Sequence, residues 1–418
     1  MVVRSLIAAL LVLVALPPAA LAQGDPLRQR QWGLDMIEAD PAHGVTRGAG
    51  ATVAVIDSGV RANHPDLGGR LLPGRDFVEN DDTPQDGDGH GTHVTGIVAA
   101  NDGNGAGVSS VAPAAMVLPV RVLDDDGSGS VGDVAQGIDF AVNAGADVIN
   151  LSLGQEVAVI GADPQFEAAI DRALDRGVIV VAASGNTGLP VCEQPSGRGR
   201  LLCVGAVDKR GMRSFFSSFG SGLGVVAPGG SGLPLTDENV LSTWGDGGYE
   251  EQAGTSQAAP FVSGIAALLV SRGLRGQSAV ERIVATARDA GPSGPDPEYG
   301  AGIVNARAAV SGGSGSFGRV FVPGVQRLRA ALRRGIRVRC AAAGNGRCRA
   351  TASRKRRRLA AGSRSVRGGR TSTLYARANR RGRRAFRRAL RRGRRLAVSV
   401  RVTLPGVAPQ RRRVVLRP

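Results

Sequence analysis

The chain has 418 residues, which is enough for two or three domains and a large apolar core. Its net charge of +18 is unevenly divided. From Ser311 onward there are 32 Arg, one Lys and no acidic residue, whereas the 20 basic residues before that point stand against 35 acidic ones, a net charge of −15. After the first 22 residues no stretch approaches the roughly 20 consecutive apolar residues of a membrane helix, which excludes a main body that spans a membrane.

Residues 1–22 have the pattern of a secretory signal peptide. Arg4 supplies the positive start, Leu6 to Leu16 form the apolar run, and the string ALA at 20–22 forms a small-residue cleavage site. We therefore expect a secreted protein, extracellular or associated with the cell wall, without a transmembrane segment once the signal is removed. An uncleaved signal that anchors the chain in the membrane is the alternative.

Residues 23–310 are expected to form one domain, and from residue 51 to 310 they alternate short apolar runs with helical patterns, which predicts parallel strands joined by crossover helices. The expected strands are Thr52 to Ile56, Met116 to Val122, Val148 to Leu153, Val178 to Ala183 and Leu202 to Ala206. The expected helices are His90 to Ala100, Val131 to Ala144, Pro164 to Arg176 and Ser256 to Ser271. We expect a three-layer α/β domain with a mostly parallel central sheet, and active residues at the carboxyl ends of its strands.

Residues 311–317 (SGGSGSF) are a Gly and Ser linker, and residues 318–418 form a separate Arg-rich part. In this part the strings GIRVRCAAAG, GRCRATAS and LAVSVRVTL alternate with period two, and GRVF and RRVVLRP are shorter candidates. The pattern predicts a small all-β, antiparallel sandwich of immunoglobulin-like form with Arg on its solvent face. The string RRAFRRALRRGRR is expected to be a helical turn in a connecting loop.

Three motifs carry the candidate chemistry: VAVIDSG around Asp57, DGHGTHVTG around His90 and AGTSQAAPFVSG around Ser256. A serine hydroxyl becomes a good nucleophile when a base takes its proton, and the imidazole that does so needs a carboxylate to hold its tautomer. Asp57 closes an apolar strand, where an unpaired carboxylate is costly. We therefore interpret Ser256 as the nucleophile, His90 as the general base and later acid, and Asp57 as its partner.

Each motif also has a plainer interpretation. The string GTS is a common helix cap. His90 and His93 are spaced as a metal-binding pair, although no HExxH motif or third ligand accompanies them. Asp88 is a rival to Asp57 because it lies two residues before His90, although it sits among glycines in a loop.

With Asp, His and Ser in this order, residues 25 to 310 resemble the subtilisin-like serine proteases (subtilases, peptidase family S8). The resemblance implies that Asn186 in VVAASGNTG donates its side-chain amide to the oxyanion, beside the backbone N–H of Ser256. It also implies that the segment from Asp25 to His43 is an N-terminal arm that wraps over the protease domain.

The resemblance further implies a substrate site made of backbone edges, because relatives place an extended peptide as an added strand between two segments. Small residues at the end of a third segment would line a roomy primary pocket for a large apolar side chain. The two edge segments are Gly127, Ser128, Gly129 and Ser152, Leu153, Gly154, and the pocket segment is Ala183, Ser184, Gly185. Asp124 to Asp126 either favour basic residues upstream of the cut or form a solvated acidic loop.

No cofactor is expected for the chemistry, but calcium is common in the family. Asp66 and Asn104 match positions of one stabilising calcium site, and Asp25 is a candidate third ligand.

The four cysteines form two local pairs along the chain, Cys192 with Cys203 and Cys340 with Cys348. An even number at short spacing in an exported chain predicts two disulfides. A zinc site is the weaker alternative, because the pairs lie far apart and no histidine is near either.

The charge of the last part predicts binding to polyanions that weakens steeply with salt. Candidate partners are anionic cell-wall polymers, the membrane surface and extracellular nucleic acid. Tyr375 is the only tyrosine of this part and Trp is absent from it, so base stacking has little support. A solvated Arg-rich face, or a tail that docks on the acidic domain, are the alternatives.

We interpret the chain as a monomeric secreted endopeptidase that hydrolyses peptide bonds in protein or peptide substrates through an acyl-enzyme intermediate, with broad specificity and an apolar pocket preference. A processing protease with few substrates is the alternative among enzymes. A binding protein with an idle catalytic site is the alternative outside them.

Overall fold

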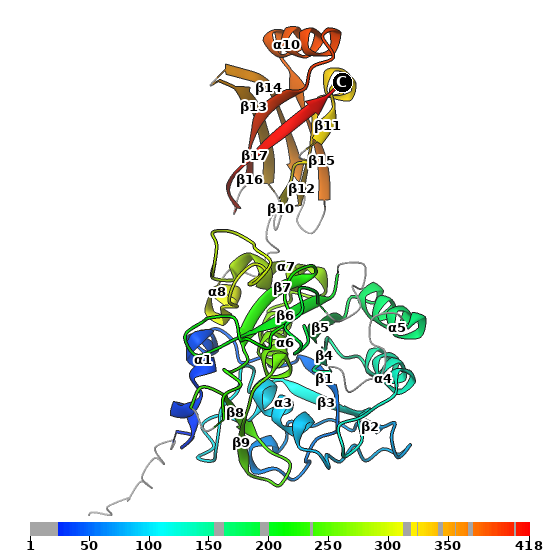
Figure 1. The fold of residues 1–418 in the computed structure, drawn as a ribbon, viewed down its shortest axis with the longest axis vertical. Coiled ribbons are helices and arrows are strands. Elements are labelled where there is room, and N and C mark those ends of the chain that lie inside the picture. Colours follow the sequence, from blue (N-terminus) through cyan, green and yellow to red (C-terminus); the bar gives the residue numbers. More distant parts are fainter. Residues whose placement is uncertain are drawn as a thin grey trace, which may run out of the picture.

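The structure is a computed structural model that describes residues 24–153, 163–192, 200–234, 237–311, 319–323, 325–341, 346–355, 357–366, 371–404 and 407–418. The expected signal peptide, and nearly all of the expected linker at 311–317, lie outside the described residues. Figure 1 displays the two main assemblies of strands, one sheet flanked by helices and one β-rich C-terminal part.

Seven strands form the first sheet, in the order β2-β3-β1-β4-β5-β6-β7. They are β1 (Thr52–Asp57), β2 (Arg75–Asp76), β3 (Met116–Arg121), β4 (Val148–Leu151), β5 (Ile179–Ala183), β6 (Leu202–Val207) and β7 (Leu223–Pro228). All neighbouring strands in this sheet are parallel. The predicted parallel central sheet is thus confirmed.

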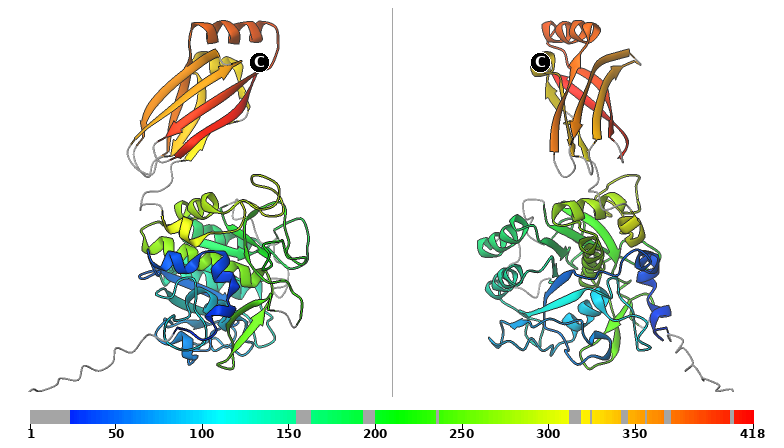
Figure 2. Two further views of the ribbon diagram at one scale, coloured as in Figure 1. Left: turned by 90° about the vertical axis from the view of Figure 1, so that its left-hand side faces the viewer. Right: turned by 180° about the vertical axis from the view of Figure 1, so that it is seen from behind.

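Helices cover both faces of this sheet (Figure 2). The longer ones are α3 (His90–Ala99), α4 (Val131–Asn143), α5 (Pro164–Asp175), α6 (Thr255–Ser271) and α7 (Gln277–Thr286), and the short ones are α1 (Trp32–Met36), α2 (Ala39–His43) and α8 (Ala306–Ser311). Val53 and Val55 of β1 pack into the core beneath α3 and α6, whereas Ala54 and Ile56 pack into the core beneath α4 and α5. Successive side chains of a strand point to opposite faces, so a strand between two helical layers is apolar throughout.

All nine elements expected in residues 23–310 exist, with ends that differ by at most two residues. Sequence analysis did not anticipate β7, α7, or the antiparallel hairpin of β8 (Val240–Thr243) and β9 (Tyr249–Gln252). It also did not anticipate the one-turn helices η1 (Arg28–Arg30) and η2 (Pro65–Leu67). None of the described helices is both long enough and apolar enough to cross a membrane.

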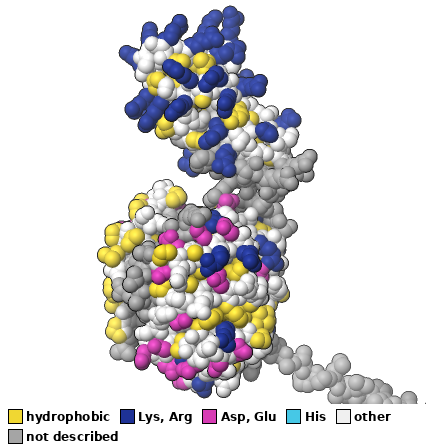
Figure 3. All heavy atoms as spheres, turned by 90° about the vertical axis from the view of Figure 1, so that its right-hand side faces the viewer, with side chains coloured by type: hydrophobic (Ala, Val, Ile, Leu, Met, Phe, Trp, Pro, Cys, Tyr) yellow, Lys and Arg dark blue, Asp and Glu magenta, His cyan; other side chains and the backbone are white. Residues whose placement is uncertain are grey.

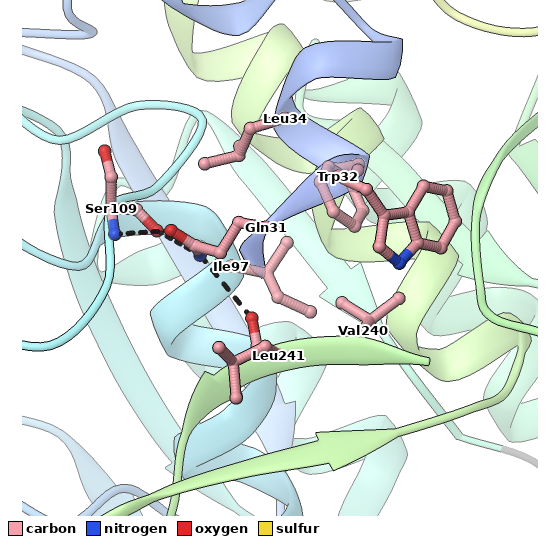
Figure 4. A pocket seen from close by; sticks show the side chains of 9 residues that line it. Gln31, Trp32, Leu34, Ile97, Ser109, Val240 and Leu241 are labelled. Carbon is pink, nitrogen blue, oxygen red and sulfur yellow. Dashed lines mark hydrogen bonds between the residues drawn. The ribbon is translucent and has the colours of Figure 1, made fainter. Parts of the chain in front are cut away.

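The N-terminal arm is held against the domain by Gln31 and Trp32, which line a small, mainly apolar cavity with Ile97 and Val240 (Figure 4). The Gln31 amide donates to the carbonyl oxygen of Ser109 (2.8 Å) and accepts from its N–H (2.8 Å), while the Trp32 indole donates to the carbonyl oxygen of residue 239 (2.9 Å). The lining is packed core with satisfied polar atoms, so we interpret the cavity as an anchor for the arm.

The C-terminal part holds eight strands in the order β10-β12-β15-β14-β13-β16-β17-β11. They are β10 (Arg319–Phe321), β11 (Val325–Arg327), β12 (Ile336–Ala341), β13 (Gly346–Arg354), β14 (Arg357–Val366), β15 (Thr371–Ala378), β16 (Leu396–Leu404) and β17 (Val407–Arg417), with helices α9 (Leu328–Arg333) and α10 (Arg380–Arg391). Its buried residues form one cluster of their own. Basic side chains gather over this part, whereas the acidic ones gather over the part that holds the seven-stranded sheet (Figure 3).

The C-terminal part is β-rich, but it differs in three ways from the sandwich that we expected. It contains two helices, β11 pairs with β17 in parallel, and β14 and β15 were not anticipated. The expected helical turn is the 12-residue helix α10, because Gly382, Phe386 and Ala389 give it a face that is buried against the sheet. Among the described residues, backbone pairing between β14 and β15 occurs at Ala360 with Ala378 and Ala361 with Arg377, which is where the group containing β12 and β15 meets the group containing β13 and β14.

Candidate active site

Asp57 and His90 meet at the carboxyl end of the central sheet. Asp57 is the last residue of β1 and is fully buried, while His90 is the first residue of α3. The Asp57 Oδ1 lies 2.7 Å from the His90 Nδ1 and also accepts the N–H of Ser58 (2.8 Å). Because an ionised carboxylate can only accept, His90 carries its proton on Nδ1, which leaves Nε2 as the basic nitrogen.

Asp86 organises the loop between these two residues, a role that sequence reasoning missed. Its Oδ1 accepts from the Ser58 hydroxyl (2.9 Å) and from the N–H of Gly89 (2.8 Å). Its Oδ2 accepts from the N–H (2.8 Å) and the hydroxyl (2.5 Å) of Thr92. One buried carboxylate thereby ties the chain after Asp57 to the first turn of α3. Its position four residues before His90 was the only sequence signal for it.

Asp88, the rival to Asp57, contacts the backbone of His90. Its Oδ1 accepts the N–H of His90 at 2.9 Å. Burial raises the pKa of its carboxyl above the usual value. Asp57 is therefore the carboxylate that holds the imidazole in the described hydrogen bonds.

Ser256 is the second residue of α6 and is almost buried. Its carbonyl oxygen accepts from the hydroxyl of Ser152, just after β4, at 2.7 Å. Helix α6 packs against α3, the helix that begins with His90. The positive end of the α6 dipole lies at the serine and favours negative charge there.

The Asn186 amide is oriented by Thr255. The Asn186 Oδ1 accepts both the N–H and the hydroxyl of Thr255 at 2.9 Å. Because a backbone N–H can only donate, this assigns the oxygen, and the Nδ2 is on the other side of the amide. A methyl carbon placed on Gly254 would lie 2.8 Å from the Gln257 Oε1, 3.5 Å from the Asn186 Nδ2 and 3.6 Å from the backbone nitrogen of Ser256. The two donors therefore flank the same small space, where they can serve one oxygen.

The first substrate segment lies in a tight loop. Leu123 and Gly129 form an antiparallel bridge, and the Oδ1 of Asp124 accepts the N–H of Ser128 (2.8 Å). Gly127 has a positive φ of 74°, a conformation that favours glycine. The loop presents backbone at its edge, as an added strand would require.

The other expected substrate residues are mostly buried. Ser152 and Leu153 follow β4, and the Ser152 hydroxyl points to Ser256. Gly154 lies outside the described residues. Ala183 ends β5, and the Ser184 hydroxyl donates to the carbonyl oxygen of residue 218 (2.8 Å). Gly185 donates its N–H to the hydroxyl of residue 255 (3.2 Å), which helps to place the neighbouring amide.

Asp25, Asp66 and Asn104 come together beside the hairpin of β8 and β9. The Asn104 Nδ2 donates to the Asp66 Oδ1 (2.8 Å), and its backbone N–H donates to the Asp25 Oδ1 (3.2 Å). Both carboxylates are buried, and neither takes part in an ion pair among the described residues. Burial, with the charge of Asp66, raises the pKa of Tyr249.

These three side chains fit a divalent cation only after one change. The oxygen of the Asn104 amide accepts the N–H of Ala106 (2.9 Å), so its nitrogen faces Asp66. Calcium would require the amide to turn. No cluster of three His, Cys, Asp or Glu side chains suited to a metal is present in the described ranges.

His93 is buried in the core, and its Nε2 lies 3.0 Å from the carbonyl oxygen of Val240 and 3.1 Å from that of Glu250. Burial lowers its pKa to about 3, so the ring is neutral and Nε2 carries the proton. His93 therefore fastens α3 to the hairpin.

Both cysteine pairs are joined. Cys192 is bonded to Cys203 on β6, and Cys340 on β12 is bonded to Cys348 on β13. The described residues contain no free cysteine.

Comparisons with known proteins define the class of this chain. The model of the subtilase family matches residues 48–302. The chain is 41% identical to thermitase of Thermoactinomyces vulgaris over 281 residues, 67% of this chain and 96% of that protein. It is 42% identical to subtilisin Savinase of Lederbergia lenta over 282 residues, 66% of this chain and 97% of that protein.

A solved structure has the same architecture. A protease of Pseudoalteromonas arctica PAMC 21717 superposes with a TM-score of 0.63 at 33% identity, covering 69% of this chain and 99% of that one. The chain belongs to the subtilase family and is a serine endopeptidase, as its motifs predicted.

Proposed function

We propose that this chain is a secreted endopeptidase in which Ser256, His90 and Asp57 act as a catalytic triad with an acyl-enzyme intermediate. The observation that carries the proposal is the 2.7 Å contact between the buried Asp57 carboxylate and the His90 Nδ1, because it leaves Nε2 free of its proton. A binding protein with an idle site has no need of this arrangement.

In the proposed mechanism, the His90 Nε2 takes the proton of the Ser256 hydroxyl as its oxygen attacks the scissile carbonyl carbon. The oxyanion accepts hydrogen bonds from the Asn186 Nδ2 and the Ser256 N–H. The imidazolium, stabilised by Asp57, gives its proton to the leaving amine as the C–N bond breaks. Water then attacks the acyl-enzyme, His90 again takes a proton, and Ser256 is regenerated.

The test is peptide-ester and casein hydrolysis by the purified protein beside Ser256→Ala. We expect the variant to lose about 10⁴-fold or more in kcat. Equal turnover by both proteins, or none by either, would overturn the triad.

We also propose a broad specificity with an apolar preference in the primary pocket. Support comes from the small residues Ala183 and Gly185 and from the described edge residues 127–129 and 152–153. A digest of a random peptide library, analysed by mass spectrometry, distinguishes this from a processing protease, which would cut few sequences, and reports any preference for basic residues beside Asp124 to Asp126.

We propose structural calcium at Asp25, Asp66 and Asn104. The support is two buried carboxylates without a cationic partner in the described ion pairs. Calcium is expected to raise the Tm and EDTA to lower it in the native chain, and Asp66→Asn should remove both responses. A Tm that changes with neither calcium nor EDTA would show that the hydrogen bonds hold these side chains together without calcium.

We further propose that residues 23–310 and 318–418 are separate domains, that the second is an immunoglobulin-like sandwich with two added helices, and that it binds anionic polymers of the cell surface. Its excess of arginine without acidic residues supports the last point. Retention on heparin at rising salt, with and without residues 318–418, tests the polyanion binding. Equal retention of the full and truncated chains would overturn that part of the proposal.

The pattern of residues 1–22 supports secretion. N-terminal sequencing of the exported protein should start at Gln23, and sedimentation should give a monomer.

A further inference from the structure

We infer that a groove on one face of the C-terminal sheet binds the phosphodiester backbone of an anionic polymer. The inference rests on the proposed polyanion binding and narrows it to one site. The groove, of about 590 Å³, crosses β13, β16 and β17. Its polar lining is Thr351, Ser353, Ser399, Arg401, Arg411 and Arg413, with Arg354 and Lys355 at one end.

The strand register brings the polar lining together. Arg401 of β16 lies opposite Thr351 of β13 and Arg411 of β17, and one row further Ser399 lies opposite Ser353 and Arg413. Neighbours across strands are about 4.5–5.5 Å apart, and residues two apart in a strand share a face. The intervening Val398, Val400 and Val402 are buried in the core, so the rows of Arg and hydroxyl groups face solvent.

The charge of the groove is uncompensated. No acidic residue occurs from Ser311 onward, and no described ion pair includes a residue beyond Arg307. Like charges placed directly opposite across strands are destabilising, and Arg401 faces Arg411. Arg354 and Lys355 add two more cations where β13 ends. A bound anion would relieve this repulsion.

The lining selects the kind of anion. Guanidinium groups present paired donors that match phosphate oxygens, and the hydroxyls of Thr351, Ser353 and Ser399 add single donors. No aromatic side chain lines the groove, so bases would not stack there. The groove also lacks the large apolar anchors that dominate protein interfaces. Its ligand is therefore recognised through a repeated backbone charge, as in a nucleic acid or a polyol-phosphate polymer.

Helix α10 supplies a matched control. Arg384, Arg388 and Arg391 are exposed on it and lie away from the groove lining. If binding is merely electrostatic attraction to the whole part, their removal should matter as much as that of three groove arginines.

The experiment uses the full chain with Ser256→Ala in every sample to prevent self-digestion. One variant carries Arg401→Gln, Arg411→Gln and Arg413→Gln, and the control carries Arg384→Gln, Arg388→Gln and Arg391→Gln. Affinity for a labelled oligothymidine of about 20 nucleotides, and for poly(glycerol phosphate) in competition, is measured from about 50 to 200 mM salt. Polyglutamate and vesicles of anionic phospholipid are the other two probes.

We expect the groove variant to lose about tenfold or more in affinity, and its slope of log K against log salt to fall by about 2, while the control changes by less than about threefold. Replacement of the three groove arginines by Lys keeps the charge, and so should preserve the salt slope while lowering affinity. The Lys variant also keeps the groove testable if the Gln variant fails to fold.

Equal losses in the groove and control variants would overturn the groove and leave the general polyanion proposal standing. No binding to any probe by the parent chain would overturn both. Polyglutamate or vesicles bound as tightly as the phosphate polymers would overturn the phosphodiester class. Similar binding of the two phosphate polymers supports it, and binding of the oligothymidine alone would assign the source to nucleic acid.

Discussion

The hydroxyl of Ser152 donates a 2.7 Å hydrogen bond to the carbonyl oxygen of Ser256, across 104 residues of sequence. The same hydroxyl accepts a hydrogen bond from the Asn150 Nδ2 (2.9 Å). The Asn150 Oδ1 in turn accepts from the hydroxyl of Ser263, which lies further along α6 (2.7 Å). All four residues are nearly or fully buried. This chain of bonds joins the end of β4 to the helix that carries the candidate nucleophile.

Ser152→Ala should lower both activity and stability. The change leaves the Ser256 carbonyl and the Asn150 amide without these partners, at a cost of about 1–3 kcal/mol. We expect the Tm to fall by several degrees and kcat to fall more than KM changes. Ser263→Ala removes only the far end of the chain of bonds, so it should lower the Tm with kcat nearly intact. Equal kcat in Ser152→Ala and the parent enzyme would contradict the positioning role.

Gly254→Ala should reduce turnover without unfolding the protein. Gly254 has φ 166° and ψ 166°, an extended conformation that alanine adopts. The new methyl would lie 2.8 Å from the Gln257 Oε1, so that side chain must shift, and 3.5 and 3.6 Å from the Asn186 Nδ2 and the Ser256 nitrogen, beside the space where the oxyanion is expected. Removal of the corresponding side-chain donor in subtilisin costs about 10²–10³-fold in kcat, and we expect a loss of that order. Steady-state kinetics and thermal unfolding of the variant test this prediction. An unchanged kcat would show that the oxyanion binds elsewhere.

His93 should make the fold sensitive to acid. Its folded pKa of about 3 lies below the unfolded value near 6.5, so the unfolded chain binds the extra proton. Stability from the neutral ring is complete above about pH 6.5 and is lost progressively as the pH falls toward 3. Burial also lowers the pKa of His43, with the same sign. In the Ser256→Ala background, the Tm should fall between about pH 7.5 and 4.5, and His93→Gln should flatten that dependence.

The bond between Cys192 and Cys203 should stabilise the first domain. It closes a loop with a sequence separation of 11, for which restriction of the unfolded chain is worth about 3 kcal/mol at most. Replacement of both cysteines by Ser should lower the Tm of the protease domain. The same change at Cys340 and Cys348 is the control, because those residues lie in the separate C-terminal cluster. If the Tm of the protease domain falls equally in both variants, the two parts of the chain do not unfold independently, which would contradict the prediction.

The sequence alone was sufficient for the class of the protein and for most of its first domain. Apolar runs such as VAVID and VINL are uniform because helices cover both faces of the sheet. Such runs can therefore be recognised as strands from a few neighbouring residues. The motifs around Asp57, His90 and Ser256 are equally local. Strand β14 was missed because its string RRLAAGSRSV buries Leu359, Ala360 and Val366 without a period-two alternation.

Contacts between distant segments could not be read in this way. The hydrogen bonds of Asp86 to both Ser58 and Thr92, the orientation of the Asn186 amide by Thr255, and the rows of arginine across β16 and β17 all depend on strand register and helix packing. Such contacts pair residues that are ordinary in their own surroundings, and only the folded chain brings them within hydrogen-bond distance.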